Sequence, residues 1–411
     1  MPMNERSAAI AGFLHAEQER QTAFLRELVR TPSDNPPGDC AAAGERAAQL
    51  LQGLGFVVER HFVPDDLVRA VGMISATNLV VRQSFGVGGP VIALNAHGDV
   101  VPPGAGWTHD PYGGAIVDGW MVGRGVAVSK SDFATYAWAL LALRELALPL
   151  AGTVELHFTY DEESGGEIGP AYLLERGISR PDLAIGAGFS YAVVDAHNGC
   201  LHLEVEVTGR SAHAAKPATG IDALQAATAI LTALYAAREG LAAVVSAIPG
   251  IGSPQLTIGL IAGGINTNVV PDRVVFRLDR RLIPEEDAGE VETGLRAIIA
   301  DAVGAVPGAM VRTSRILLAK PLVPLPGADR IAAALCAAAT LVMGETVKTA
   351  GMPLYTDARH YAAAGVPVVL YGAGPHTIEE ANAHRADERL KLDDLFKATE
   401  VVALALAALL S

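Results

Sequence analysis

The sequence has few cysteines, no long apolar run and a deficit of positive charge. Only three cysteines occur in 411 residues, at Cys40, Cys200 and Cys336, and no two of them form a Cys-x-x-Cys pair. They are too few for a disulfide framework in a chain of this length, so we expect reduced, structural thiols. No segment approaches the roughly 20 apolar residues that span a bilayer, and the first residues, MPMNERSAAI, lack a signal-peptide core. These absences predict a cytoplasmic protein.

The charge balance narrows the classes of partner. Lys and Arg number 31 against 45 Asp and Glu, for a formal net charge of -14. A chain this acidic, with few clusters of basic residues, offers no phosphate-binding surface for DNA or RNA. We therefore expect a small-molecule substrate rather than a nucleic acid or a membrane. The length exceeds what one hydrophobic core usually organises, which favours two domains.

The first third of the chain alternates helical and strand patterns. Residues 6–30 and 41–54 have helical periodicity, and the Pro- and Gly-containing segment 33–38 separates them. The apolar runs 91–94 and 154–158 are typical of buried strands, and each leads directly into a polar cluster. Ligands of α/β sheets bind at the carboxyl ends of strands, so these clusters mark a candidate site.

The middle of the chain has a different pattern. Residues 201–207 alternate apolar and polar, as in a strand with one wet face. The elements that follow are a helix at 220–240, strands at 255–261 and 273–282, a helix at 285–303 and a strand at 310–317. This β-α-β-β-α-β order is typical of a ferredoxin-like domain. We place it at 199–317, inserted between the two parts, 1–198 and 318–411, of an α/β domain whose last elements are a helix at 331–342 and a strand at 366–371.

The pair His97 and Asp99 follows the first buried strand. Two residues apart on an extended chain, both side chains can face one side. A metal-bound histidine commonly donates its second N–H to a carboxylate, which fixes the tautomer. A structural role for this short pattern is equally compatible with the sequence.

Three adjacent carboxylates, Asp161, Glu162 and Glu163, follow the second buried strand. Their repulsion calls for a compensating cation, although a solvated acidic turn is the alternative. Beside a divalent ion, one glutamate can bind the metal while its neighbour takes a proton from water.

Further motifs give the chain a resemblance to a known family. Their order resembles that of dinuclear-zinc deacylases and exopeptidases, which include aminoacylase, acetylornithine deacetylase, succinyl-diaminopimelate desuccinylase and glutamate carboxypeptidase. The motifs are Gly123-Arg124-Gly125, Gly209-Arg210-Ser211-Ala212-His213, Gly264-Ile265-Asn266-Thr267-Asn268-Val269-Val270-Pro271, Thr356-Asp357-Ala358-Arg359 and Ala383-His384. The resemblance covers nearly the whole chain. It implies a zinc-peptidase-like mixed sheet flanked by helices, with the inserted ferredoxin-like domain acting as a lid and dimerisation domain.

The resemblance also implies a role for each residue of the two polar clusters. His97, Glu163 and His384 match the metal ligands, Asp99 matches the partner of His97, and Glu162 matches the general base. The implied reaction is metal-dependent hydrolysis of a C–N bond in a small N-acyl, N-carbamoyl or aminoacyl compound.

Four further residues match substrate-binding positions of the family. His213 and Asn266 would reach a substrate in the neighbouring subunit's site, which implies a homodimer, although a loop residue is the plain alternative for His213. Arg281 and Arg359 match positions that bind a substrate carboxylate. Either arginine could instead form a structural ion pair.

Two departures from the family pattern affect the metal. The family has Ala-x-Asp-x-Lys after Gly-Arg-Gly, with an aspartate that bridges two metals, and here Val128 stands at that position. The family's Gly-Glu-Pro is replaced by Gly-Ala-Gly, so Ala187 stands where a ligand of the second metal is expected. Both losses fall on the second metal position, while His97, Glu163 and His384 suffice for one ion with an open position.

We therefore predict one divalent ion per chain rather than two, zinc first, with manganese or cobalt also compatible with His and Glu ligands. Asp132, one helical turn beyond Val128, is a further candidate ligand, or else a cap of the helix at 133–148. Two alternatives to amide hydrolysis stay open. One is a different metal-dependent reaction at a C–N or carboxyl centre, and the other is a non-catalytic binding protein, which the retained Glu162 disfavours.

Overall fold

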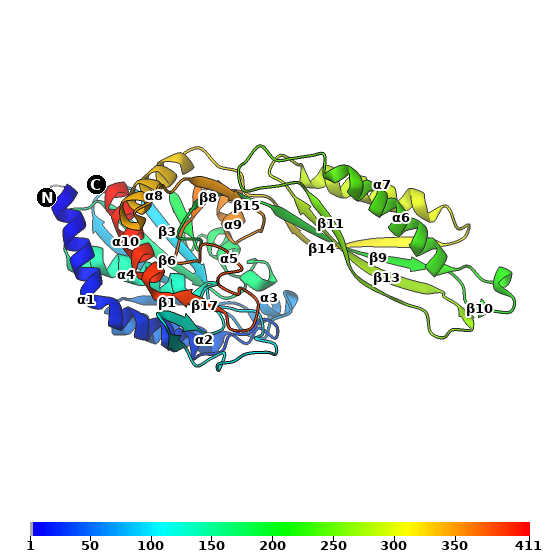
Figure 1. Ribbon diagram of the computed structural model, residues 1–411, viewed down its shortest axis with the longest axis horizontal. Helices are drawn as coiled ribbons and strands as arrows, with labels where there is room; N and C mark the ends of the chain where they lie inside the picture. Colours follow the sequence, from blue (N-terminus) through cyan, green and yellow to red (C-terminus); the bar gives the residue numbers. More distant parts are fainter. Residues whose placement is uncertain (1–2) are drawn as a thin grey trace. The chain divides into compact units, whose positions relative to one another are not determined.

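The computed structural model describes residues 3–411, which fall into two compact units (Figure 1). The first unit holds the chain up to Asp195, Pro324–Ala350 and Thr356–Ser411. The second unit holds Ala196–Val323 and Gly351–Tyr355. The insertion that we placed at 199–317 lies within the second unit.

A mixed eight-stranded sheet, in the order β1-β2-β6-β3-β7-β16-β8-β15, is the centre of the fold. Its strands are β1 (Val58–Phe62), β2 (Thr77–Gly86), β3 (Val91–His97), β6 (Gly152–Thr159), β7 (Leu183–Gly186), β8 (Val193–His197), β15 (Thr349–Met352) and β16 (Val368–Leu370). β3 runs parallel to β6 and β7, so the carboxyl ends of these three strands meet at one edge. A small sheet joins β4 (Ala115–Val117), β5 (Trp120–Val122) and β17 (Arg389–Lys391).

Helices cover the first unit's sheet (Figure 1). They are α1 (Met3–Val29), α2 (Ala41–Gly53), α3 (Asp65–Ala70), α4 (Lys130–Glu145), α5 (Pro170–Glu175), α8 (Ala328–Met343), α9 (Ala358–Ala363) and α10 (Leu392–Leu409), with a short 3-10 turn, η1 (Glu162–Ser164). No helix among residues 3–411 has the length and apolarity needed to cross a membrane.

Helix α4 lies in the core and holds the end of β6 in place. Its residues from Lys130 to Leu143 are all buried, between α1 and α10 and against the sheet. Phe133 stacks on Phe158 of β6 with ring centroids 3.8 Å apart, and Trp138 meets Phe24 of α1 edge-on at 5.0 Å. Aromatic pairs of this kind add about 0.5–1.5 kcal/mol each beyond the area that they bury. The start of α4 is thereby fixed beside the strand ends that carry the polar clusters.

The second unit is an antiparallel sheet covered on one face by two helices. The sheet order is β11 (Gln255–Gly263), β13 (Arg273–Leu282), β9 (Gly199–Thr208) and β14 (Met310–Ala319). The helices are α6 (Ala223–Leu241) and α7 (Ala288–Val303), and the small elements β10 (Ala212–His213), η2 (Pro217–Thr219) and β12 (Val269–Val270) complete the unit. Chain order and sheet order together give the ferredoxin-like arrangement.

Local chemistry explains how this unit forms. Along β9, Leu201 and Leu203 are buried and the intervening His202 is half-buried, as expected from period-two alternation. Each helix begins at an aspartate whose side chain accepts two backbone N–H bonds, Asp222 for α6 and Asp287 for α7. Such caps contribute about 1 kcal/mol each. The predicted fold class, a mixed α/β sheet flanked by helices with a ferredoxin-like insertion, is confirmed.

Candidate active site

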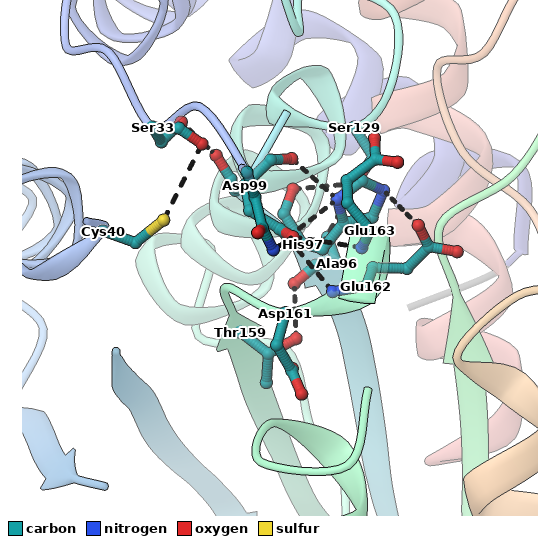
Figure 2. Close-up of polar contacts among 12 residues, drawn as sticks. Ser33, Cys40, Ala96, His97, Asp99, Ser129, Thr159, Asp161, Glu162 and Glu163 are labelled. Carbon is teal, nitrogen blue, oxygen red and sulfur yellow. Dashed lines mark hydrogen bonds and ion pairs between the residues drawn. The ribbon is translucent and has the colours of Figure 1, made fainter. Parts of the chain in front are cut away.

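The two polar clusters lie side by side at the carboxyl edge of the sheet. β3 ends at His97, which is opposite Thr159, the last residue of its parallel neighbour β6. The turn η1, which carries Glu162 and Glu163, follows β6 directly. Strand topology therefore brings together residues that lie more than sixty positions apart in the chain, and Figure 2 shows them in one cluster.

Asp99 connects the two clusters. Its fully buried carboxylate accepts the backbone N–H groups of Glu162, at 3.2 Å, and Glu163, at 3.1 Å, and a 3.0 Å bond from Nδ2 of Asn35 (Figure 2). The same carboxylate lies 3.3 Å from Nδ1 of His97. Because Nδ1 of His97 also faces the Asp99 carbonyl oxygen at 3.0 Å, Nδ1 carries the proton and Nε2 is left for the site. Asp99 thus orients both His97 and the backbone of η1.

Serine and asparagine side chains that the sequence did not single out hold this cluster. The Ser129 hydroxyl bonds to both the backbone N–H and the carbonyl of His97, at 3.1 and 3.0 Å. The Ser33 hydroxyl donates to the carbonyl of Gly98 at 2.6 Å. Asn35 and Ser33 lie in a loop without periodicity, so no sequence pattern indicates their role. Ser129 directly follows the altered position Val128, and this neighbourhood could have indicated a role in the site.

Glu162 has the electrostatic surroundings of a base. Its carboxylate lies 4.0 Å from Nε2 of His97, and its side chain is only 16% exposed. Burial raises the pKa of the Glu162 carboxyl to about 8, with His97 opposing the shift and the charges of Glu163 and Asp99 adding to it. A carboxylate whose pKa is raised towards neutrality binds a proton more strongly than an ordinary glutamate, as a general base requires.

Glu163 and His384 form a second pair. Nε2 of His384 lies 3.6 Å from Oε1 of Glu163, and this contact raises the pKa of the imidazole. His384 lies in a loop with φ of +61°, a conformation that is uncommon outside glycine. The loop brings the imidazole to a carboxylate more than two hundred residues earlier in the chain.

The donors suit a divalent ion, but they lie in pairs rather than in one closed set. Imidazole nitrogen and carboxylate oxygen are zinc ligands, and two ligands of one tetrahedral zinc lie about 3.3–3.6 Å apart, which the Glu163–His384 pair matches. His97 lies instead beside Glu162. Within residues 3–411, His97, Glu163 and His384 do not form a group whose ligand atoms all lie within 4.8 Å of one another.

Asp132 is not the cap of helix α4, and its role as a metal ligand stays a prediction. It lies in the first turn of α4, whose cap residue is Ser129, and its side chain accepts the backbone N–H of Ala373 at 2.7 Å. The cap alternative is therefore wrong, because the side chain bonds to a distant loop rather than to its own helix. Burial raises the pKa of Asp132 to about 7.

The two altered positions flank His97. Val128 is half-buried and precedes Ser129, which bonds to the backbone of His97. Ala187 is half-buried directly after β7, and its N–H donates to the carbonyl of Asn95 on β3 at 2.8 Å. An acidic side chain at either position would start from the same edge of the sheet as His97.

A buried ion pair that the sequence did not reveal holds the backbone around Val128. Arg124 donates to Glu388 at 2.6 Å, and both side chains are 1% exposed. The Glu388 carboxylate also accepts the N–H groups of Gly125, Ala127 and Val128, at 3.1, 3.0 and 3.2 Å. No local pattern around Glu388 predicts this role.

The four residues predicted to bind substrate do not all lie in the same unit: three are in the second unit and one is in the first. His213 on β10 and Asn266 before β12 are exposed in the second unit, where His213 pairs with Val269 across the two strands. Arg281 lies 3.0 Å from Asp279, also in the second unit. Arg359, on α9 of the first unit, is 8% exposed, donates to the carbonyl of Gly165 and lies 3.8 Å from Glu167. Both arginines thus form the ion pairs that were their structural alternative, and their substrate roles stay predictions.

The fold and the paired His and Glu donors define a class, the metallohydrolases that act on C–N bonds, and comparisons with known proteins identify the family. The model of the peptidase family M20/M25/M40 matches residues 93–408. The chain belongs to this family. The predicted family, its metal-dependent amide hydrolysis and the enzyme class are confirmed.

Individual relatives span nearly the whole chain. A succinyl-diaminopimelate desuccinylase of Rhodospirillum centenum is 28% identical over 403 residues, covering 92% of this chain and 94% of that protein. An acetylornithine deacetylase of Myxococcus xanthus is 30% identical over 374 residues, covering 88% and 90%. The crystal structure of an M20 family metallo-carboxypeptidase from Sulfolobus solfataricus matches with a TM-score of 0.76 at 17% identity, covering 95% of this chain and 99% of that one.

Proposed function

We propose that this protein hydrolyses the amide bond of a small N-acyl, N-carbamoyl or aminoacyl compound, with Glu162 as the general base. The observation that carries this proposal is the position of Glu162, a largely buried carboxylate of raised pKa that lies 4.0 Å from Nε2 of His97. Relatives named as a desuccinylase and a deacetylase support an N-acyl substrate.

We also propose that the protein is located in the cytoplasm. The three cysteines form no disulfide, which supports a reducing compartment such as the cytoplasm.

Each residue of the site has a separate role in the proposed reaction. Glu162 takes a proton from water as the water oxygen bonds to the carbonyl carbon, and it passes this proton to the amine as the C–N bond breaks. Asp99 keeps His97 and the backbone of η1 in register throughout. A divalent ion bound here would polarise the carbonyl and lower the pKa of water. His213 and Asn266 would donate to the developing oxyanion.

We further propose that one divalent ion binds per chain, held by His97, Glu163 and His384, with zinc favoured over manganese or cobalt. The 3.6 Å separation of Glu163 and His384 supports two of these ligands. The orientation of His97, with Nε2 left for the site by Asp99, supports the third. Val128 and Ala187, apolar where the family carries carboxylates, support a single ion rather than two.

Restoring the two carboxylates should restore a second metal. We expect the unmodified protein to bind about one catalytic ion per chain, and Val128→Asp with Ala187→Glu to raise the occupancy towards about two. Val128→Asp alone should do less, because one added carboxylate holds a second ion poorly. The difference in metal content between the double variant and the parent, from elemental analysis of dialysed protein, measures the occupancy gained at this site. Thermal melts with chelator should show greater destabilisation of the double variant, since its new carboxylates are then uncompensated.

The matched control for this prediction is Val128→Asn with Ala187→Gln. It has nearly the same side-chain volumes without the charge, so the occupancy should stay that of the parent. Two tightly bound ions at this site in the unmodified protein would contradict the proposal and would identify another residue, Asp132 first, as a replacement ligand.

We propose a homodimer formed through the second unit, in which His213 and Asn266 serve the partner's site. Their exposure in the second unit, away from any internal core, supports this proposal. Mixing inactive Glu162→Gln chains with inactive His213→Ala chains should restore activity, because a hybrid dimer assembles one site with both intact residues.

The hybrid experiment needs verified subunit exchange and a neighbouring control. Lys216→Ala changes an exposed residue of the same loop and should leave activity near that of the parent. Absence of recovery in exchanged dimers would count against a shared site.

The loss of carboxylates at Val128 and Ala187 favours one alternative, a different metal-dependent reaction at a C–N or carboxyl centre on the same scaffold. Turnover on a panel of N-acyl, N-carbamoyl and aminoacyl compounds separates the two. Release of a free amine supports amide hydrolysis, and conversion of substrate without a released amine supports the alternative. A metal-replete protein that binds these compounds without converting any of them would indicate a binding protein.

A further inference from the structure

A cluster of cysteine, histidine and aspartate lies on the second unit's sheet, outside the candidate active site. Cys200 and His202 are two residues apart on β9 and therefore lie on the same face. Asp279 on β13 is the direct cross-strand partner of His202. Leu201, which lies between them, and Leu203, which follows, are in the core beneath the helices, so the cluster is on the face opposite α6 and α7.

The three donor atoms have the spacing of ligands around one ion. Sγ of Cys200 lies 3.0 Å from Nε2 of His202 and 3.6 Å from Oδ1 of Asp279, and Nε2 lies 3.2 Å from Oδ2 of Asp279. Tetrahedral zinc with S, N and O ligands places these atoms about 3.3–3.6 Å apart, so the 3.6 Å pair already matches and the two shorter pairs must open slightly when the ion enters. Of the His, Cys, Asp and Glu side chains in residues 3–411, these make up the one group of three whose donor atoms all lie within 4.8 Å of one another.

The geometry disfavours a catalytic relay. In a Cys-His-Asp relay the cysteine and the aspartate bond to opposite nitrogens of the imidazole. Here both approach the same atom, Nε2 of His202. Convergence of a sulfur, a nitrogen and an oxygen on one point is what a metal site requires.

The exposure of the three side chains lets an ion reach the cluster. Cys200 is fully buried, whereas the side chains of His202 and Asp279 are 32% and 29% exposed, so solvent and ions reach the cluster from the imidazole and carboxylate side. A nearby cation competes for the carboxylate, since Arg281 lies 3.0 Å from Oδ2 of Asp279. Arg281 also lies over the ring of Tyr355, 5.9 Å from its centroid, which gives the guanidinium a second contact.

We propose that Cys200, His202 and Asp279 bind a divalent transition-metal ion, with Zn²⁺ the best match to a mixed thiolate, imidazole and carboxylate set. Binding releases the thiol proton of Cys200 to solvent, and the thiolate and carboxylate together balance the two charges of the ion. The ion takes Asp279 from Arg281, so occupancy of this site sets whether that arginine is paired. This site is separate from the metal of the proposed amide hydrolysis and does not depend on it.

Cobalt titration of the reduced full-length protein tests the site. A thiolate bound to Co²⁺ gives a near-ultraviolet charge-transfer band, and the ligands proposed at the active site include no sulfur, so the band reports Cys200 alone. We expect the band to saturate when about one Co²⁺ per chain has bound in addition to the ion of the active site. It should be lost in Cys200→Ser and kept in Cys336→Ser, the matched control at a half-buried cysteine of the first unit. Zn²⁺ should displace the bound Co²⁺ and thereby abolish the band.

Three further variants separate this site from the active site and from misfolding. His202→Gln and Asp279→Asn should each raise the Co²⁺ concentration at half-saturation of the band by roughly tenfold or more, because each removes one ligand. Glu163→Gln should leave the band unchanged, whatever happens to turnover. If Cys200→Ser does not fold, these two ligand variants decide the question. Absence of the band in the reduced parent, its survival in folded Cys200→Ser, or its indifference to His202→Gln and Asp279→Asn would overturn the proposal.

Discussion

Replacing Glu162 by glutamine should reduce turnover by roughly a hundredfold or more, the usual consequence of losing a general base. A carboxamide cannot take the proton from water, and within residues 3–411 no second carboxylate lies within 4.0 Å of Nε2 of His97. Glu163, its neighbour, is turned to His384. The rate constant on the best N-acyl substrate, measured at saturating substrate and metal, is the quantity to compare.

The same replacement should leave folding and metal content nearly unchanged. Asp99 accepts the backbone N–H of residue 162, not its side chain, so η1 keeps its position in Glu162→Gln. Removing a buried carboxyl whose pKa burial has raised also relieves an electrostatic cost. Turnover should therefore fall without a matching change in the melting temperature or the metal stoichiometry.

Glu175→Gln is the matched control, since Glu175 is an exposed glutamate at the end of α5 in the same unit. It should have the turnover of the parent. Near-normal turnover of Glu162→Gln would contradict the assigned role, and loss of metal together with activity would move Glu162 from base to ligand.

The sequence predicted the parts of the site that follow regular elements. A buried strand ends at His97, another leads into Glu162 and Glu163, and parallel pairing of β3 with β6 puts the two ends together. Local periodicity was enough for these elements, as it was for the helix and strand order of the second unit. The helix predicted at 41–54 matches α2 at Ala41–Gly53.

The sequence did not predict elements and contacts whose cause lies far along the chain. The second half of helix α10 (Leu392–Leu409) has only apolar side chains from residue 401 onwards, so no polar stripe marks its period there. The carboxylate of Asp132 bonds to Ala373, 241 residues away, and Arg124 pairs with Glu388, 264 residues away. Such pairs depend on tertiary packing, and no spacing rule applied to a local window detects them.

The Arg124–Glu388 pair explains how the backbone beside His97 is held without a bridging carboxylate. Oε1 of Glu388 accepts the backbone N–H groups of Ala127 and Val128. Oε2 accepts the backbone N–H of Gly125 and a guanidinium N–H of Arg124. Both oxygens of Glu388 are therefore acceptors for two donors each. The chain leading into Ser129, and through Ser129 to His97, depends on this one buried side chain.

Glu388→Gln should destabilise the first unit by about 3–5 kcal/mol, because it leaves the Arg124 guanidinium buried without a counter-charge. The new amide also turns an NH₂ group towards two donors, whichever way it is oriented, so buried N–H groups lose their acceptors. All three tryptophans, Trp107, Trp120 and Trp138, lie in the first unit, so tryptophan fluorescence follows the unfolding of that unit alone. With a slope near 3 kcal/mol/M, the urea midpoint should fall by about 1 M or more.

Glu45→Gln, which breaks the exposed ion pair of Glu45 with Arg60, is the control for Glu388→Gln. Glu45 also makes two contacts with one guanidinium, at 2.8 and 3.1 Å, but its side chain is 49% exposed. Water replaces the lost contacts in Glu45→Gln, so the free energy of unfolding should fall by less than about 1 kcal/mol. If Glu388→Gln unfolded at the same urea concentration as Glu45→Gln, the buried pair would not be what holds residues 124–128. The position of Ser129 and His97 would then have to come from the packing of α4 alone.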